Sequence, residues 1–390
     1  QGATVLDASP GVYYDPVACN DFAALYPSSI ISHNLSPDTR LVKEEEYSPD
    51  DTIVDCGKGT MYRFTRKKKG IIPIVLESLL GERKKAKRAM GAQTDSFQKA
   101  IWNGVQLGYK LVCNSMYGQL GSGFSKVRCR EVAEATTATG RSMLQLAMTT
   151  AKELYPDCRI VYGDTDSIFV QYVTGLPREE ALTKTAECAI ALEEAMDKIL
   201  PYPHKLEAEK ILTPMILFSR KRYSGMLYAP DALTKGKILH MGSALVRRGV
   251  TGILKLLMET VVEAIFDGTP ADVIRSNVTD MLFDVATGKY PIEMFTMSAA
   301  WNPDTLTIPV HSALAYRMLG RGDPNAPVVG GRVQYVYVKK PVEPTEMHSP
   351  AFAAKVRAYG RPAPDSCRYV EDPDYATKHN LELDYERYIS

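Results

Sequence analysis

Hydrophobic and polar positions along the 390 residues follow two different periods, which together outline the fold. Helical patterns at 73–90 and 95–117, separated by a short turn, predict a helical hairpin. Apolar runs on either side of an acidic turn predict a β-hairpin at 159–172, and further strands are expected at 205–240. Other helices are expected at 27–33, 131–155 and 178–199, with two or three more from residue 246 onward.

The remaining segments carry weaker patterns. Residues 1–35 indicate strands and turns that lead into the first short helix, and the polar stretch 36–72 predicts a β-ribbon or a loop. Proline and glycine recur through 302–344, and a shorter polar tail follows. Strands that alternate with helices favour an α+β core with helical excursions.

Composition narrows the class of protein. A hydrophobic content of 45% is enough for buried cores, and the length suggests two or three domains. No apolar run reaches the length of a membrane span and no segment resembles a signal peptide, so no membrane partner is expected. The seven cysteines are scattered without a Cys-x-x-Cys pair, which argues against zinc and a disulfide framework and favours a reducing interior compartment.

The net charge is only +1, but basic residues cluster locally. Such clusters suit contacts with phosphate groups, although any one of them can equally be a solvated helix face. The clusters are Arg63 with 66–69, then 83–88, 220–222 and 247–248.

The most informative stretch holds two aspartates, Asp164 and Asp166, at the tip of the expected β-hairpin. Gly163 is expected to provide the backbone geometry of a tight turn. Because alternate strand residues point the same way, the hairpin predicts that both carboxylates project to one point, where a divalent cation would offset their repulsion. An acidic turn with solvated carboxylates is the alternative.

A third aspartate, Asp21, follows an apolar strand at 17–19. Pro27 is expected to start the next helix, where its missing N–H costs nothing. Backbone amides at such a strand-to-helix turn can bind phosphate, so Asp21 is placed to share a metal with an incoming phosphate. Tyr26 lies at the turn, where its ring could lie under a sugar. The alternative for Asp21 is a helix cap.

The helical hairpin presents cations from both of its helices. Arg83 and Lys87 are four residues apart on one face, and Lys110, Asn114 and Tyr117 share a face of the second helix. These side chains could clamp a triphosphate. The alternative is a solvated basic helix, against which Lys110 argues because it lies in the apolar run 107–113.

A fourth constellation is the basic segment 219–225, which contains Lys221, Arg222 and Tyr223. A strand with cations and a tyrosine suits the backbone and minor groove of a duplex. An edge strand guarded by charge is the alternative. Taken together, the four constellations suggest phosphoryl transfer assisted by two cations, and His33 is expected to be structural.

These motifs resemble those of the family B DNA polymerases, in order and in spacing, over nearly the whole chain. The segments DFAALYPS at 21–28, KLVCNSMYG at 110–118, YGDTDS at 162–167 and KRY at 221–223 carry the resemblance. GATV at 2–5, GVYY at 11–14 and EDPDY at 371–375 are most similar to the delta and herpesvirus-type branch. A large double-stranded DNA virus is the source that this resemblance favours.

The resemblance implies a right-hand polymerase with an antiparallel-sheet palm at 1–70 and 123–245, helical-hairpin fingers at 71–122 and a mainly helical thumb at 246–390. It implies template-directed addition of dNTPs to a primer 3′-hydroxyl on primer-template DNA, in the nucleus or a viral replication compartment, with a processivity factor as a partner. Two Mg²⁺ ions would be held by Asp21 and Asp166, with Asp164 as an outer partner. The substrate would contact Leu25, Tyr26, Arg83, Lys87, Lys110, Asn114 and Tyr117, and the primer strand Lys221, Arg222 and Tyr223.

Some positions depart from the family pattern. Ala24, Ser29 and Arg220 replace a usual serine, apolar residue and lysine, and 296–301 lacks a Lys-x-Leu that contacts DNA in the family. Exonuclease motifs do not appear, so we expect the polymerase half of a larger protein. Two alternatives remain at this point: an inactive polymerase-like scaffold that binds nucleic acid, and ribonucleotide polymerisation, against which the ring of Tyr26 argues.

Overall fold

The computed structural model describes residues 2, 4–305, 307–342, 350–360 and 363–389. The chain divides into two compact units, Gln1–Leu239 and His240–Ser390. The boundary lies close to the expected start of the last domain at residue 246. No helix in the described ranges is both long enough and apolar enough to cross a membrane.

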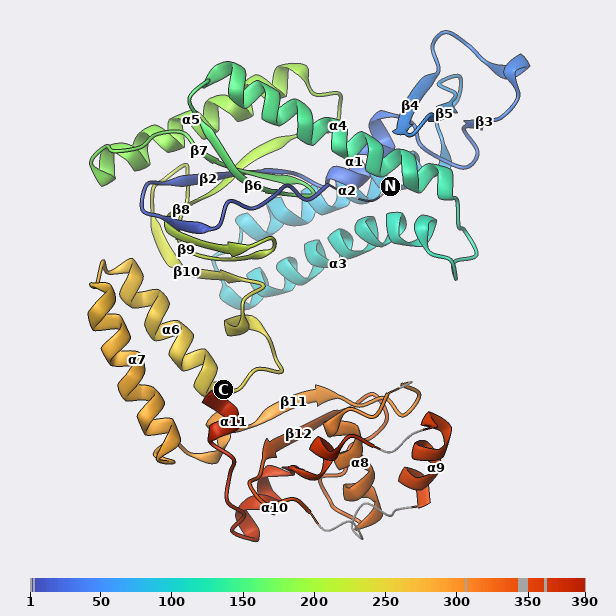
Figure 1. Cartoon of the computed structure of the whole chain (residues 1–390). Helices are drawn as coiled ribbons and strands as arrows, with labels where there is room; N and C mark the ends of the chain where they lie inside the picture. The colour runs from blue at the N-terminus through green and yellow to red at the C-terminus, as the bar shows by residue number, and fades with distance from the viewer. Residues whose placement is uncertain (1, 3, 306, 343–349, 361–362, 390) are drawn as a thin grey trace. The chain divides into compact units, whose positions relative to one another are not determined.

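A curled seven-stranded sheet forms the centre of the first unit (Figure 1). Its strand order is β10-β9-β8-β2-β7-β6, with β1 paired to β8. The pairs from β6 to β9 are antiparallel, which confirms the expected β-hairpin and the strands at 205–240. The strands are β1 Gly11–Tyr13, β2 Val17–Phe22, β6 Arg159–Asp164, β7 Ser167–Gln171, β8 Leu206–Ser219, β9 Arg222–Tyr228 and β10 Lys235–Met241.

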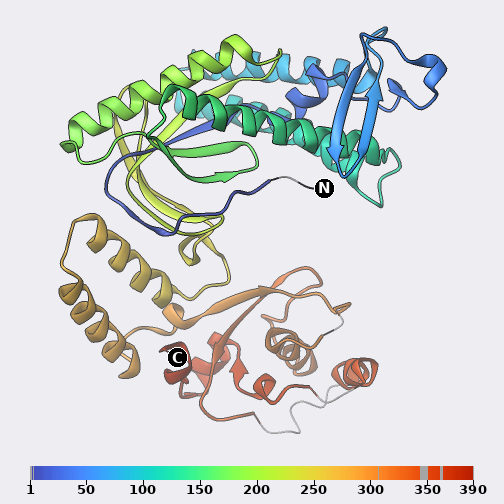
Figure 2. The same ribbon diagram turned by 45° about the horizontal axis from the view of Figure 1, so that its top comes forward.

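The two faces of this sheet are covered differently. Helices α4, Arg130–Leu154, and α5, Arg178–Ile199, cover one face, where Ala18 and Phe22 of β2 are buried among them (Figure 2). On the other face Val17 and Cys19 pack with aromatic side chains and with the N-terminal segment. Since side chains alternate along a strand, Asp21 belongs to this second face, away from the helices.

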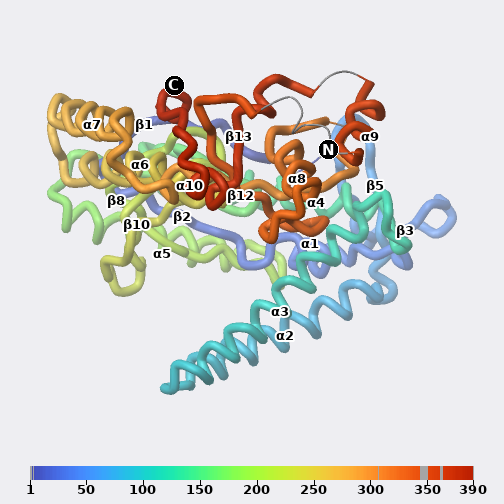
Figure 3. Tube along the Cα trace, turned by 90° about the horizontal axis from the view of Figure 1, so that it is seen from below, coloured from blue at the N-terminus to red at the C-terminus, as the bar shows by residue number. Residues whose placement is uncertain are grey.

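The predicted helical hairpin is confirmed. Helix α2, Ile71–Gly91, and helix α3, Ser96–Gly121, lie side by side along their length (Figure 3). The carboxylate of Asp95 accepts a hydrogen bond from the Gln98 amide (2.8 Å) and so caps α3 at its N-terminus.

Helix α1, Leu25–Ser32, starts before the expected 27–33. Ala24 takes a left-handed conformation (φ 54°) and ends the extended run of β2, so the helix begins at the next residue. Pro27 therefore lies within the first turn, where its missing N–H still costs no hydrogen bond.

Residues 36–72 form the expected β-ribbon, with a short third strand added to it. They form a small antiparallel sheet in the order β3-β5-β4, and a short 3₁₀ turn connects β3 to β4. The elements are β3 Arg40–Leu41, the turn Glu44–Glu46, β4 Thr52–Gly57 and β5 Thr60–Phe64.

The second unit starts with the helices expected after residue 246, but the weak pattern at 302–344 concealed a helix and a strand. Its prolines mark element boundaries: Pro309 precedes helix α8 directly. A three-stranded sheet, β11-β12-β13, packs with α8. The elements are α6 Gly252–Phe266, α7 Ala271–Ala286, β11 Met297–Ala300, α8 Val310–Gly320, β12 Arg332–Tyr337, α9 Pro350–Tyr359, β13 Val370–Glu371, α10 Pro373–Lys378 and α11 Glu386–Ile389.

Candidate active site

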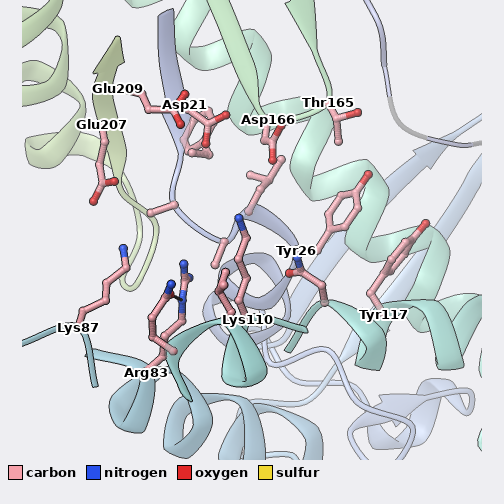
Figure 4. A pocket seen from close by; sticks show the side chains of 17 residues that line it. Asp21, Tyr26, Arg83, Lys87, Lys110, Tyr117, Thr165, Asp166, Glu207 and Glu209 are labelled. Carbon is pink, nitrogen blue, oxygen red and sulfur yellow. Dashed lines mark hydrogen bonds between the residues drawn. The ribbon is translucent and has the colours of Figure 1, made fainter. Parts of the chain in front are cut away.

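One pocket of the first unit joins side chains from distant parts of the sequence (Figure 4). Its volume is about 570 Å³, and its walls come from the β2–α1 turn, α2, α3, the β6–β7 turn and β8. The acids Asp21, Asp166 and Glu209 lie across the pocket from the cations of α2 and α3. Nine of the predicted residues line it: Asp21, Leu25, Tyr26, Arg83, Lys87, Lys110, Asn114, Tyr117 and Asp166.

Asp21 lies near the end of β2, with Ser167 of β7 on one side and Glu207 of β8 on the other. Burial of its carboxyl raises its pKa to about 7, and the charges of Asp166 and Glu209 add to the shift. The helix-cap alternative is wrong, because the N-cap residue of α1 is Ala24 and no side chain caps this helix. Asp21 thus carries a charge that no neighbouring cation fully compensates.

Asp164 and Asp166 make different contacts. Asp164 ends β6, and Lys221 Nζ donates to its two carboxylate oxygens at 2.7 and 2.9 Å. Asp166 belongs to the turn, after Thr165 in the left-handed region (φ 59°), and the strand alternation ends there. Only Asp166 lines the pocket, and burial raises the pKa of its carboxyl, with the charge of Asp164 adding to the shift.

Gly163 has a different role from the one expected. Thr165 takes the positive φ of the turn, whereas Gly163 lies within β6. A Cβ at Gly163 would lie 2.6 Å from Leu6 Cδ1 and 3.1 Å from the Ser167 carbonyl oxygen. The glycine therefore allows the N-terminal segment to approach β6 closely.

Cations from both helices of the hairpin reach the pocket. Arg83 and Lys87 come from α2 and Lys110 from α3, and the charge of Lys110 lowers the pKa of both Asp21 and Asp166. The sequence indicated that Lys110 lies in a buried apolar run. This interpretation was wrong, because Leu107 and Leu111 are exposed. Its position opposite the acids, rather than its burial, distinguishes Lys110 from a solvated cation.

Two tyrosines form the other side of the pocket. The ring centroids of Tyr26 and Tyr117 lie 4.4 Å apart with a tilt of 40°. Burial raises the pKa of Tyr26 to about 12, so its hydroxyl is neutral. Leu25 is almost fully buried in the core beside Tyr26, so it offers mainly its backbone to the pocket.

The start of α1 offers backbone donors to the same pocket. Amides in the first turn of a helix have no acceptor within that helix, and together they favour an anion. The amides of Ala24, Leu25 and Tyr26 occupy this position, whereas the Ala23 amide already donates to the Lys205 carbonyl at 2.9 Å.

Two glutamates in the pocket, Glu207 and Glu209, were missed. They are two residues apart on β8, so both point to one face, and Glu207 is the register partner of Asp21. The Glu-Ala-Glu spacing inside an expected strand was the available signal, but only the register of β8 on β2 brings it to Asp21. Lys210 Nζ donates to Glu209 and forms an ion pair with it.

The basic segment after β8 contacts Asp164 through Lys221. Lys221 is in the β8–β9 turn (φ 62°), and its amide donates to the Tyr162 hydroxyl at 2.7 Å. Arg222 is exposed, but Tyr223 is buried, with its ring centroid 5.2 Å from that of Phe169. The alternative that this segment is an edge strand protected by its charges is wrong, because β9 lies between β8 and β10.

The acids of the pocket do not form a complete metal cage. Within the described part of the chain, no three His, Cys, Asp or Glu side chains are arranged to hold a metal ion. Magnesium is commonly held by one or two carboxylates, substrate phosphates and water rather than by the protein alone. The carboxylates of Asp21 and Asp166, with Glu209 nearby, fit that donor set.

The fold and the pocket agree with what sequence comparison finds. Residues 1–390 match DNA polymerase family B, and the chain belongs to this family. It is 30% identical to the DNA polymerase delta catalytic subunit of Caenorhabditis elegans, with all of the chain and 35% of the relative covered. It is 34% identical to the DNA polymerase of Paramecium bursaria Chlorella virus NY2A, over 76% of the chain and 34% of the relative. The chain thus spans about a third of the length of these relatives.

Proposed function

We propose that this chain contains the polymerising centre of a DNA-directed DNA polymerase, which adds dNTPs to a primer 3′-hydroxyl. The observation that carries the proposal is the pocket in which Asp21 and Asp166 face Arg83, Lys87 and Lys110. The carboxylates can bind metal ions beside the reacting α-phosphate, and the cationic side chains can bind the negatively charged phosphates of the triphosphate. The names of the relatives, which are DNA polymerases, support the same substrate class.

The triphosphate would be held from two sides. Arg83, Lys87 and Lys110, with Asn114, would contact its β- and γ-phosphates from the helical hairpin. The amides of Leu25 and its neighbours at the start of α1 would bind the same groups from the sheet side. This clamp orients the α-phosphorus toward the carboxylates.

Two Mg²⁺ ions would be held by Asp21 and Asp166, with Asp164 as an outer partner. When bound, they supply charge stabilisation for the attacking and leaving oxygens. The primer 3′-oxygen forms a bond to the α-phosphorus and loses its proton, while the bond to the β-phosphate oxygen breaks. Pyrophosphate leaves with that electron pair.

Tyr26 and Tyr117 would shape the sugar and base side of the pocket. The neighbouring Tyr117 ring would restrict Tyr26, so that the Tyr26 ring lies under the deoxyribose and clashes with a 2′-hydroxyl. Tyr117 would border the nascent base pair. The ribonucleotide alternative would be favoured only if the chain used ribonucleotides efficiently and Tyr26→Ala brought no gain.

DNA would contact the face that carries Lys221 and Arg222, and Tyr223 would support this turn from the core. In this proposal the seven-stranded sheet belongs to the palm, helices α2 and α3 form the fingers, and the second unit forms the thumb. Contacts to the DNA backbone predict binding that weakens with salt. We further propose that a processivity factor assists, and that the enzyme acts in the nucleus or a viral replication compartment. A large DNA virus remains the proposed source.

Primer extension tests the proposal. The purified chain, a primer-template and four dNTPs should give extension that depends on Mg²⁺ and stops with a chelator. Asp157→Asn, which alters an exposed acid outside the pocket, is the matched control for substitutions of Asp21 and Asp166. Failure of the wild-type chain to extend the primer, although it binds the DNA, would instead support the inactive scaffold. That alternative has no observation in its favour, because Asp21, Asp164 and Asp166 are all present.

A further inference from the structure

A second cavity adjoins the polymerising pocket. We propose that it is a binding site for departing pyrophosphate, which enters it from the polymerising pocket; this inference rests on the proposed function. Its volume is about 470 Å³, and it lies between α1, α2 and the segment before β8. Pyrophosphate would pass through this cavity on its way out, and in the reverse reaction on its way in.

The two cavities share part of their walls. Arg83, Lys87 and Glu207 line both, as do the backbone positions of the β2–α1 turn. In Figure 4 these three side chains lie on the side of the polymerising pocket away from Tyr26 and Tyr117. An anion held by Arg83 and Lys87 can therefore be contacted from either cavity, and it can pass between them without losing these two cations.

The charge of the walls differs between the cavities. The polymerising pocket has four acidic side chains against three basic ones. The second cavity has four basic side chains against two acidic ones: Arg83, Lys84, Lys87 and Lys205 against Glu77 and Glu207. Because free pyrophosphate carries several negative charges, the potential favours its movement into the second cavity once its bond to the α-phosphorus is broken.

Lys84 and Lys205 are the two cations that the second cavity has and the polymerising pocket lacks, and Lys84 is exposed. Within the described ranges it forms no ion pair, whereas Lys205 Nζ lies 3.0 Å from Glu193 Oε1. Lys84 is thus available to an anion, and Lys205 adds a charge that Glu193 partly offsets.

The test compares two neighbouring lysines of α2. Lys84→Ala removes the cation from the cavity, and Lys85→Ala is the matched control, since Lys85 pairs with Glu82 (2.7 Å) and lines neither cavity. Three quantities are measured for each variant: the dNTP Kd, the single-turnover rate of incorporation, and the KM for pyrophosphate in pyrophosphorolysis. Calorimetric titration of pyrophosphate into the chain gives its affinity without any reaction.

Lys84→Ala should raise the KM and the Kd for pyrophosphate about fivefold, the effect of one charge near contact in water, and Lys84→Ala with Lys205→Met should raise them further. The dNTP Kd and the single-turnover rate should stay within about twofold, and Lys85→Ala should match the wild type. Pyrophosphate constants that do not change, or that change in step with the dNTP Kd, would overturn the inference. In either case normal extension by the wild type leaves the proposed function standing, whereas a wild-type chain that adds no nucleotide contradicts the proposed function itself.

Discussion

Two carboxylates, one in each unit, have opposite electrostatic surroundings. Glu371 in the second unit is fully buried, and it pairs with Arg317 at 3.5 Å and with Arg321 at 2.9 Å. Asp21 in the first unit is mostly buried beside other acids, which raises its pKa to about 7. A compensated buried charge holds structure together, whereas an uncompensated one costs stability and is retained where it has a function.

Asp166→Asn should greatly reduce activity. Loss of its charge removes a donor at the reacting phosphate, so the single-turnover rate should fall at least about a thousandfold while DNA binding persists. Rapid-quench primer extension and a DNA-binding titration measure the two quantities. A fall below about tenfold would mean that this acid is no more functional than Asp157.

Glu371→Gln should cause the largest loss of stability. It leaves the guanidinium of Arg317 buried with less compensation, so the free energy of unfolding should fall by about 3 kcal/mol. Glu382→Gln is the control, because Glu382 pairs with Lys339 at the surface (2.8 Å) and should cost under about 1 kcal/mol. Denaturant unfolding measures both. Equal costs would remove the distinction between the two kinds of carboxylate.

The requirement for Mg²⁺ should depend on pH. The raised pKa of Asp21 means that its carboxyl holds a proton below about pH 7, and that proton competes with the metal. The Mg²⁺ concentration for half-maximal extension should therefore rise by up to about tenfold for each pH unit below 7 and level off above it. A midpoint that is the same at pH 6 and pH 8 would contradict this.

Substitution of Asp164 should lower the single-turnover rate less than substitution of Asp166, because Lys221 compensates the charge of Asp164. Asp164→Asn should lower the single-turnover rate about tenfold, and Lys221→Met about threefold, since the pair is partly exposed. Both variants are measured alongside Asp166→Asn. Equal losses at Asp164 and Asp166 would show that compensation does not separate the two roles.

The sequence predicted helices and strands well where the periodic pattern was strong. Both helices of the hairpin and the β6–β7 hairpin were predicted close to their observed bounds. It failed where short elements depend on long-range packing, as in β12, which pairs with β11 and β13 across a large sequence separation. Pro309 also suggested an irregular segment, although it lies at the start of a helix.

Much of the pocket lining could be predicted from the sequence, but the contacts within the pocket could not. Local motifs identified Asp21, Asp166 and Lys110, because each belongs to a short pattern of its own. The divergence of Asp164 from Asp166 depends on the left-handed Thr165 and on Lys221, far along the chain. Glu207 needed the register of β8 on β2, which no local pattern gives.

Asp21→Asn tests the central claim most directly, because stability and activity should move in opposite directions. The folded pKa lies above the unfolded value, so the fold binds more protons between about pH 4 and 7 and loses stability as the pH rises through that window. At pH 8 without Mg²⁺ the variant should gain about 2–4 kcal/mol of unfolding free energy, with little gain below pH 4. Its primer extension should fall at least about a thousandfold. Extension at the wild-type rate would contradict the account, whatever the stability.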